Sequence, residues 1–458
     1  YRPFRRLPCT KAWIRPVEEP SLIGTKQLSH AAAYAIGHGL TGGTDGRLQS
    51  FRDQRVRALV AHAYEFVPYY QALMDRNRIR PQDIQSVADL AHFPISRKDD
   101  FQGQSVTPFL DRRVDKTRLI LHKTSGSTGQ PLQIYRNWGE ERIYGAYRWS
   151  VMAQYGYRPT ARHAELEELQ PQRNGDNRLF HRAAAALGLF RQRRIQAMQE
   201  PEEICQEIGE FRPTVLSGYA GVLLRAAVAL PDAIRDRLSL RFVAAHSDKL
   251  TAPMVQCISE AFRAPVFELY DAYETNVLAW QCPEHNVLHT ADACAVVDLV
   301  DGDQSVGEGE CGEVVLTALH SYSMPFIRYA IGDLATRAPR CPCGRASAAL
   351  RSVDGRTVEY FALGDGRVLH PYELYAAIPD NSWIRQYQLL QLSLQSFRLD
   401  VVLARPVSDG LRQESQRRVT ALLGEGADFR INIVTRLGSG KERKLRAFRS
   451  LVENPPQG

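Results

Sequence analysis

The segment 123–132, KTSGSTGQPL, gathers hydroxyl side chains and glycines that could bind phosphate groups. Glycines let the backbone approach an anion closely, and backbone N–H groups and small hydroxyls donate to its oxygens. The spacing is not that of a Walker loop, because no Gly-Lys-Ser/Thr follows the second glycine. A loop of this composition is equally typical of a plain connector. The residues of this candidate phosphate loop that could bind are Thr124, Ser125, Gly126, Ser127, Thr128 and Gly129.

Three cysteines and two histidines form a second group with chemical potential. Cys282 precedes His285 and His289 in CPEHNVLH, and Cys341 and Cys343 follow in CPCGR. Three thiolates and one imidazole match a closed, structural zinc site, and either histidine could complete it. Without a visible secretory signal, we expect a metal rather than a disulfide. The other cysteines are isolated and are expected to be buried, reduced thiols: Cys9, Cys205, Cys257, Cys294 and Cys311.

Length and composition indicate a globular protein of two or three domains. The 458 residues can bury a large core, and the hydrophobic content of 44% is ordinary. No apolar run approaches the roughly 18 to 20 residues that span a bilayer, so we expect no membrane segment. The first residue is Tyr rather than Met, and we expect the natural start to be missing. No signal peptide is visible in what is given, and we expect a cytoplasmic protein.

The formal net charge of +7 comes from Lys and Arg residues scattered through the chain. No basic module with interleaved aromatic residues is present, so we expect no nucleic-acid partner. A basic surface instead favours ATP or another anionic substrate.

The elements that must position these residues follow from the apolar pattern. Residues 1–50 are rich in Pro, Gly and Arg and predict an extended arm with a short helix near 28–36. Helical spacing then runs over 53–74. The candidate phosphate loop lies between 118–122, which has the composition of a buried strand, and 138–155, which has helical periodicity.

Beyond residue 119, strand and helix patterns alternate, which predicts parallel βαβ units. After Ala293 the strands cluster in ACAVVDLV, GEVVLTAL and PFIRYAI, as in an antiparallel or barrel-like subdomain. The predicted helices are 202–211, 221–229 and 253–262, and the predicted strands are 214–217, 240–245 and 266–270.

The composition shifts again near 355–357. The remaining chain predicts strands at 386–394, 399–404 and 429–435 and a helix at 410–423, which would form a small mobile α+β cap. We therefore predict an α/β fold in three parts: an N-terminal arm (1–50), a large domain with parallel βαβ layers and a β-rich subdomain (51–355), and the C-terminal cap (356–458).

Four further motifs follow the candidate phosphate loop in order. They are YDAYETN at 270–276, MPFIRYAIGDL at 324–334, VDGRT at 353–357 and SGK at 439–441. In order and approximate spacing the chain resembles the adenylate-forming ligases, most closely the phenylacetate–coenzyme A ligase-like and capsule-biosynthesis ligase-like branch, from about Arg52 onward. Similar Cys and His positions occur in part of that family. The resemblance implies ATP-dependent activation of a carboxylic acid as an acyl adenylate, with release of pyrophosphate.

The resemblance also implies roles for individual residues. The candidate phosphate loop would hold the β- and γ-phosphates, and Glu274 would coordinate Mg²⁺. Asp333 would accept both ribose hydroxyls, and Arg356 would touch phosphate or ribose. Lys441 would reach the substrate carboxylate and the α-phosphate. The nucleotide site would also include Ser247, Asp248, Tyr270, Asp271, Ala272 and Tyr273. Tyr270 and Tyr273 would lie along the adenine or the acyl pocket, with core packing as the alternative for both.

An acyl pocket is expected between the helix after the candidate phosphate loop and the ends of the following strands. Its residues would be aromatic or small, which favours a flat aryl or short acyl acid, although core packing explains the pattern nearly as well. The candidates are Tyr147, Gly218, Tyr219, Ala245 and His246.

The chain departs from the family pattern in three places. Gln130 stands where many relatives have Lys, which removes a positive charge from the phosphate end. The hinge has Val358 and Glu359 where two aspartates are common, and GDGRVLHPYEL replaces the glycine-rich stretch after it. A missing hinge carboxylate puts in doubt the rotation that switches relatives from adenylation to thioester formation. Such variants resemble the branch that includes deazaflavin-cofactor adenylyltransferases and natural-product ligases.

The sequence alone leaves three functions open. The leading one uses ATP and Mg²⁺ to form an acyl adenylate and then transfers the acyl group to coenzyme A. The second delivers the acyl group to an amine or a carrier-protein thiol, or acts as an adenylyltransferase. The third is a zinc-stabilised binding protein without turnover, against which Glu274, Asp333, Arg356 and Lys441 argue. For each of these functions we expect a monomer or a homodimer.

Overall fold

The computed structural model describes most of the chain between residues 45 and 452. The predicted helix near 28–36 and most of the candidate phosphate loop lie outside the described residues. The described segments are 45–101, 105–123, 132–168, 187–247, 250, 252–353, 361–365, 367–369, 374–375, 377–379, 383–403, 405–424, 426–435 and 448–452.

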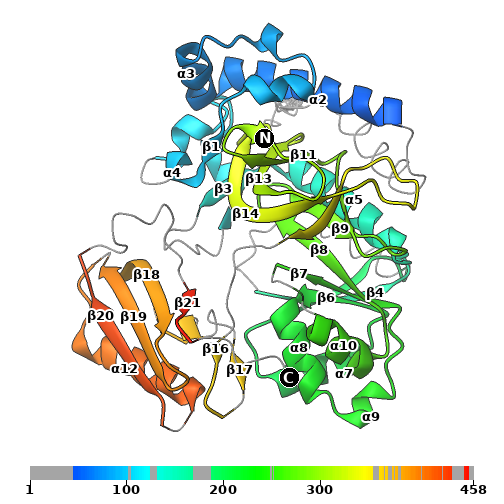
Figure 1. Cartoon of the computed structure of the whole chain (residues 1–458). Coiled ribbons are helices and arrows are strands. Elements are labelled where there is room, and N and C mark those ends of the chain that lie inside the picture. The colour runs from blue at the N-terminus through cyan, green and yellow to red at the C-terminus, as the bar shows by residue number, and fades with distance from the viewer. Residues whose placement is uncertain are drawn as a thin grey trace, which may run out of the picture.

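A single mixed sheet organises the large part of the molecule (Figure 1). Its strands follow the order β12-β11-β13-β14-β15-β10-β9-β8-β7-β6-β4-β5, and β1 pairs with β14. The strands from β8 to β5 are parallel, which confirms the predicted βαβ units. They are β4 (Arg162–Glu167), β5 (Arg191–Gln196), β6 (Val215–Tyr219), β7 (Phe242–His246) and β8 (Val266–Ala272).

Helices cover both faces of this parallel half. Because side chains alternate along a strand, neighbouring residues enter different cores. On one face Leu216 of β6 packs with Leu223 of a helix, and on the other Val215 packs with Met152 of another helix. The helices of the first face are α7 (Pro201–Phe211), α8 (Ala220–Ala229), the short α9 (Asp232–Arg235) and α10 (Ala252–Phe262), and the helix of the second is α5 (Trp138–Gln154).

The other half of the sheet is antiparallel and continues without a break from the parallel half. This arrangement confirms the predicted antiparallel strands, and it shows that they are not a separate sheet. The segment PFIRYAI was expected to be strand throughout, but β14 begins only at Tyr329. The antiparallel strands are β9 (Asn276–Gln281), β10 (Leu288–Thr290), β11 (Ala295–Asp301), β12 (Gln304–Ser305), β13 (Cys311–Ala318), β14 (Tyr329–Ala338) and β15 (Ala349–Val353), and the short β1 (Ser96–Arg97) pairs parallel with β14.

Two helices, α2 (Asp45–Phe66) and α3 (Pro68–Arg76), replace the single helix predicted over 53–74. Val67 between them is extended, with φ −115° and ψ 108°. Proline lacks an N–H and its ring disfavours a helical residue before it, so Pro68 ends one helix and starts the next. The short elements that follow are η1 (Pro81–Asp83), η2 (Ala88–His92), α4 (Lys98–Phe101), η3 (Thr107–Phe109) and η4 (Lys116–Arg118).

The candidate phosphate loop connects the two strands of a hairpin. Strands β2 (Ile120–Lys123) and β3 (Gln133–Arg136) pair antiparallel on either side of it. The prediction that the loop leads directly into a helix was therefore wrong, because β3 lies between the loop and α5. Asn137 caps α5: its side chain accepts from the Glu140 N–H, and the Glu140 carboxylate accepts from the Asn137 N–H.

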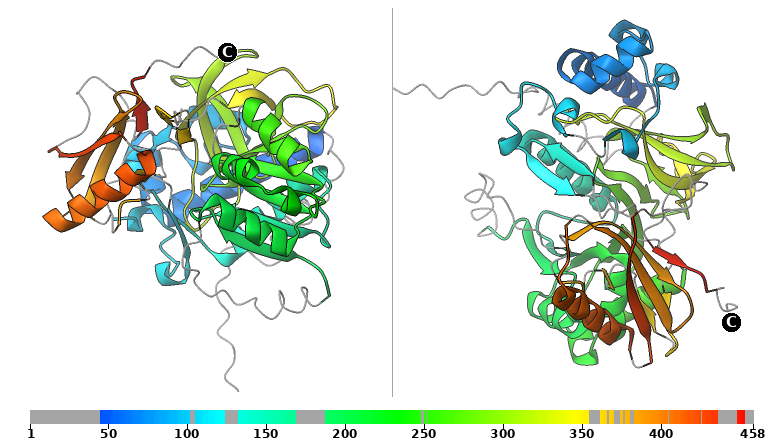
Figure 2. Two further views of the ribbon diagram at one scale, coloured as in Figure 1. Left: turned by 90° about the horizontal axis from the view of Figure 1, so that it is seen from below. Right: turned by 90° about the vertical axis from the view of Figure 1, so that its left-hand side faces the viewer.

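The C-terminal residues form a four-stranded sheet with the order β20-β19-β18-β21 and one long helix (Figures 1 and 2). Their core gathers around Trp383, Phe397 and Val419. The α+β content agrees with the predicted cap, whereas the boundaries 1–50, 51–355 and 356–458 stay a prediction, since 354–360 lie outside the described residues. The elements are β16 (Phe361–Ala362), β17 (Val368–Leu369), β18 (Ile384–Gln391), β19 (Ser396–Leu403), α12 (Asp409–Leu423), β20 (Asp428–Ile433) and β21 (Phe448–Ser450).

Candidate functional site

Two of the sequence motifs meet at the end of β8. The Tyr270 hydroxyl donates to Asp333 Oδ2 at 2.9 Å, although 63 positions separate the two residues. This bond joins YDAYETN to MPFIRYAIGDL. Tyr270 also packs against a large apolar cluster. Its ring therefore contributes to core packing, while its hydroxyl belongs to the predicted site.

A bulge in β14 directs Asp333. Glu313 of β13 pairs with Leu334, whereas Val315 pairs with Ala330, so the β14 strand carries extra residues between these pairs. Gly332 lies within them at φ +85°, a conformation that favours glycine. Bulges re-aim side chains beside functional sites. The glycine immediately before Asp333 was the signal for this geometry in the sequence.

Glu274 lies in the turn between β8 and β9 and is buried, with 6% of its surface exposed. The hydroxyl of Ser321 donates to the Glu274 carbonyl at 3.4 Å. Next to it, Tyr273 is half exposed and its ring lies 6.0 Å from that of His122. His122 belongs to β2, so the strand that enters the candidate phosphate loop lies beside the YDAYETN turn.

Several predicted site residues lie outside the described residues, and their roles stay predictions. They are Thr124, Ser125, Gly126, Ser127, Thr128, Gly129, Asp248, Arg356 and Lys441.

An ionic network occupies the opposite face of β8. It joins the predicted site residues Asp271, Ser247 and His246 to Arg148 and Glu165, which the sequence analysis missed. Arg148 of α5 donates through Nη1 to Asp271 Oδ2 at 3.1 Å, and its Nη2 lies 3.6 Å from Glu165 Oε1 of β4. Ser247 donates to Asp271 Oδ1 at 3.3 Å, and His246 Nδ1 lies 3.5 Å from Asp271 Oδ2. Periodicity placed 138–155 in a helix, but only the folded structure shows which carboxylates face its arginine.

The protonation of this network follows from burial and charge. Burial is the largest single influence on Glu165 and opposes its ionisation, but the neighbouring positive groups, led by Arg148, together outweigh burial and hold the pKa of Glu165 below its ordinary value. Burial lowers the pKa of His163 to about 4, so that its imidazole is neutral near pH 7. His163 Nε2 is 2.8 Å from the Ser217 hydroxyl.

The structure divides the five predicted acyl-pocket residues between different surroundings. Tyr219 and His246 face the network, with ring centroids 5.6 Å apart. Ala245 is fully buried in the apolar core on the other face of the sheet, which argues against contact with substrate. Gly218 lies on that same face, where an added Cβ would come within 2.7 Å of Leu166 Cβ. Tyr147 is buried against His320, with ring centroids 5.3 Å apart.

Four of the five candidate zinc ligands come together. The ligand atoms of Cys282, His289, Cys341 and Cys343 all lie within 4.8 Å of one another, and His285 is not part of this group. His289 belongs to β10, a strand that the sequence analysis did not predict. Of the two histidines left open by the sequence, His289 is therefore the one that lies with the three cysteines.

The geometry of this cluster fits a tetrahedral metal ion. Ligand bonds of about 2.3 Å to sulfur and 2.0 Å to nitrogen place two sulfurs about 3.8 Å apart and a sulfur and a nitrogen about 3.5 Å apart. The Sγ atoms of Cys341 and Cys282 are 3.9 Å apart, and Cys343 Sγ is 3.3 Å from His289 Nε2. The Ser347 hydroxyl lies 3.0 Å from His289 Nδ1, as an outer partner that fixes the tautomer would. Burial lowers the pKa of His289 to about 4, which favours the neutral ligand form.

The remaining cysteines only partly follow the prediction of buried thiols. Cys205 and Cys294 are buried and Cys257 is half-buried, but Cys311 at the start of β13 is exposed. Cys9 lies outside the described residues.

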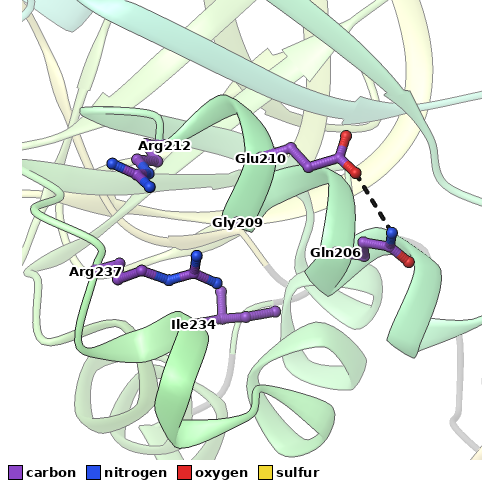
Figure 3. A pocket seen from close by; sticks show the side chains of 6 residues that line it. All are labelled: Gln206, Gly209, Glu210, Arg212, Ile234 and Arg237. Atoms are coloured by element: carbon purple, nitrogen blue, oxygen red, sulfur yellow. Dashed lines mark hydrogen bonds between the residues drawn. The ribbon is translucent and has the colours of Figure 1, made fainter.

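A separate hollow of about 380 Å³ lies between α7 and α9 (Figure 3). The Gln206 amide donates to Glu210 on its rim, and Arg212 and Arg237 lie on the far side. None of the predicted site residues lines it, so it is distinct from the site at the strand ends.

In the part of the chain that the structure describes, no helix combines the length and the apolar character needed to cross a membrane.

Comparison with known proteins agrees with this architecture. No known family model matches the chain. It is 25% identical over 387 residues to the phenylacetate-coenzyme A ligase of Thermus thermophilus, which corresponds to 80% of this chain and 84% of the relative. It is 23% identical over 300 residues to protein CapK of Staphylococcus aureus, 62% of each chain.

Solved structures show the same fold. A 2-hydroxyisobutyryl-CoA ligase, in complex with 2-HIB-AMP and CoA, matches with a TM-score of 0.63 and 19% identity and covers 90% of this chain and 91% of its own. The chain is therefore similar in sequence to phenylacetate-coenzyme A ligases and to CapK, and it has the fold of the adenylate-forming ligases.

Proposed function

We propose that the protein activates a carboxylic acid with ATP as an acyl adenylate and then transfers the acyl group to coenzyme A. The observation that carries this proposal is the Tyr270–Asp333 hydrogen bond, which brings two separate motifs of the superfamily to one strand end beside Glu274. The Thermus relative is a phenylacetate-coenzyme A ligase, and the 2-hydroxyisobutyryl-CoA ligase structure holds both an acyl-AMP and CoA.

In the first step, an oxygen of the substrate carboxylate attacks the α-phosphorus of ATP, and the bond from that phosphorus to pyrophosphate breaks. Lys441 would neutralise the charge that develops on the carboxylate and α-phosphate, and Arg356 would assist at the phosphate. The candidate phosphate loop would hold the departing pyrophosphate. Asp333 would bind the ribose hydroxyls, and its carboxylate is held by Tyr270.

Glu274 is proposed to hold Mg²⁺. A carboxylate oxygen suits this hard cation, which would offset the phosphate charge. Glu274 lies in the turn after β8, and its neighbour Tyr273 lies beside His122 of the strand that leads into the candidate phosphate loop. Gln130 in that loop supplies no positive charge, so this chain would depend more strongly on Mg²⁺ and Lys441 than relatives with a lysine there.

In the second step, the thiolate of coenzyme A attacks the acyl carbon and AMP leaves. The altered hinge, with Val358 and Glu359, keeps a second candidate open, in which an amine or a carrier-protein thiol is the acceptor or the protein acts as an adenylyltransferase. The two acceptors are distinguished by product mass. A thioester that forms only with coenzyme A would exclude the amide route.

The first step is tested by exchange of labelled pyrophosphate into ATP, which requires reversible formation of an acyl adenylate. We expect exchange that depends on an added carboxylic acid and on Mg²⁺. If no acid in a broad aryl and acyl panel supports exchange, the enzyme interpretation is wrong.

We also propose that Cys282, His289, Cys341 and Cys343 hold a structural zinc ion. The distances between their ligand atoms support this metal and its geometry. All four positions of a tetrahedral site are filled by protein, which leaves no position for a substrate. Metal analysis of the purified protein should give about one zinc per chain, and a folded protein without bound metal would contradict the proposal.

A further inference from the structure

The network of Arg148, Glu165 and Asp271 contains an unmatched pair of polar atoms. Arg148 Nη2 is buried and makes no hydrogen bond to any residue that the structure describes. The nearest charge to it in the network is Glu165 Oε1, at 3.6 Å, which is beyond hydrogen-bonding distance. The other Glu165 oxygen accepts from the Gln192 amide at 2.9 Å. The network therefore presents one donor and one acceptor that do not satisfy each other.

The position of this pair is that of a ligand site. It lies at the carboxyl ends of the parallel strands, where open α/β sheets bind their ligands. The side chains of Arg148, Glu165 and Asp271 are 13%, 16% and 15% exposed, so the network is mostly buried and meets solvent at its edge, with Arg148 Nη2 on its inner side. Asp271 follows Tyr270 directly, and alternation along β8 sends the two side chains to opposite faces. A molecule held by Tyr270 and Asp333 on one face can therefore extend past the strand end to the network.

The charges of the network argue against an apolar occupant. Glu165 and Asp271 carry two negative charges against the single positive charge of Arg148, and nearby Arg194 is engaged by Glu167. A phenyl or alkyl group placed against them would remove water from charged atoms and return no hydrogen bond. The sequence analysis favoured a plain aryl acid because of small and aromatic residues expected around the acyl group. Two of these residues, Ala245 and Gly218, lie on the other face of the sheet.

We propose that the acid activated by this protein carries a hydroxyl group on its acyl tail, and that Glu165 and Arg148 bind this hydroxyl. A hydroxyl both donates and accepts, so it can donate to Glu165 Oε1 and accept from Arg148 Nη2. An ammonium group could only donate and would leave the guanidinium unmatched. This inference rests on the proposed adenylation, since it concerns the acid that the same site activates.

The test compares matched acids in pyrophosphate exchange with the unmodified protein. Phenylacetate and short alkanoates are each measured with hydrogen, methyl, amino or hydroxyl at every position of the tail. A site built to bind a hydroxyl rejects the analogue that lacks it, and we expect kcat/KM for at least one hydroxylated acid to exceed its hydrogen and methyl analogues by about 100-fold or more.

Two variants assign the effect to the network. Glu165→Gln keeps the size of the side chain but changes its charge, and it should reduce the preference for the hydroxylated acid by about tenfold or more. Glu207→Gln, in a carboxylate of α7 that pairs with Arg193 at 3.1 Å, should leave the preference unchanged.

The outcomes separate this inference from the proposed function. Exchange with none of the acids would overturn the adenylation itself. Exchange in which no hydroxylated acid exceeds its methyl analogue by tenfold would overturn the hydroxyl proposal and leave adenylation standing. A preference for the amino analogues would also overturn it, since the excess negative charge would then govern recognition. An unchanged preference in Glu165→Gln would remove Glu165 from the role.

Discussion

The hydrogen bond between Tyr270 and Asp333 offers a direct test of how the nucleotide is bound. Replacement of Tyr270 by Phe keeps the ring that packs against the apolar cluster and removes only the hydroxyl that donates at 2.9 Å. A hydrogen bond to a charged group contributes about 1.5 to 3 kcal/mol. If Asp333 binds the ribose only when its carboxylate is held by this bond, loss of the hydroxyl weakens ATP binding. The upper limit is about 10-fold for a bond of about 1.5 kcal/mol and about 150-fold for a bond of about 3 kcal/mol.

The assay is acid-dependent pyrophosphate exchange, measured over a range of ATP concentrations. We expect Tyr270→Phe to raise KM for ATP by about tenfold, with a smaller effect on kcat. The matched control is Tyr64→Phe, because the Tyr64 hydroxyl donates to Asp75 at 3.0 Å on the exposed surface of α2 and α3. This control should leave KM unchanged.

A double-mutant cycle with Asp333→Asn shows whether the two residues act together. The effect of Tyr270→Phe should largely disappear when Asp333 is already Asn, because the hydroxyl then has no carboxylate to hold. An unchanged KM for ATP in Tyr270→Phe, or an equal effect in both backgrounds, would refute the reasoning.

Three other predictions concern the cap, the metal and the histidines. Lys441→Ala should lower adenylate formation by orders of magnitude, whereas Lys444→Ala in the same segment should not; equal activities would remove Lys441 from the mechanism. Cys341→Ala should abolish zinc binding and lower the melting temperature, while Cys311→Ala at an exposed, isolated thiol should retain full metal content. Burial lowers the pKa of His163 to about 4 and of His320 to about 3, below the ordinary value of 6.5. The unfolded chain therefore binds more protons than the native protein below pH 6.5, and the free energy of unfolding should fall between pH 6.5 and 4, with a slope of at most about 1.4 kcal/mol per pH unit for each histidine. Urea unfolding across this range measures the slope, and a stability that is level or rises toward pH 4 would contradict it.

Features that depend on local sequence were predicted well. Helical periodicity over 138–155 predicted α5, which begins at Trp138 and ends at Gln154. The parallel βαβ units followed from alternating periodicities, because each helix buries one face against the sheet. The three cysteines of the cluster were recognisable from ligand chemistry before their positions were known.

Features that depend on contacts between distant segments were not predictable from local pattern. Arg148 looks like any helix arginine until Glu165 and Asp271 are placed opposite it. His289 could not be chosen over His285 without β10, which is only three residues long and pairs with β9 and β15. The division at Val67 was missed because apolar spacing continues across Pro68.

The bond between Tyr270 and Asp333 has a mechanical consequence for the sheet. In the strand order, β8 and β14 are four steps apart, which on a flat sheet would separate them by about 19 Å. Two side chains cannot span that distance, so the hydrogen bond is possible only because the sheet curls back on itself. The arc that makes this curl consists of β15, β10 and β9; His289 lies in β10, and the three cysteines lie in the connections that follow β9 and precede β15. Metal binding would therefore fix the curvature that sets the opening between Tyr270 and Asp333. Removal of zinc should therefore lower the affinity for ATP under conditions in which the protein is still folded.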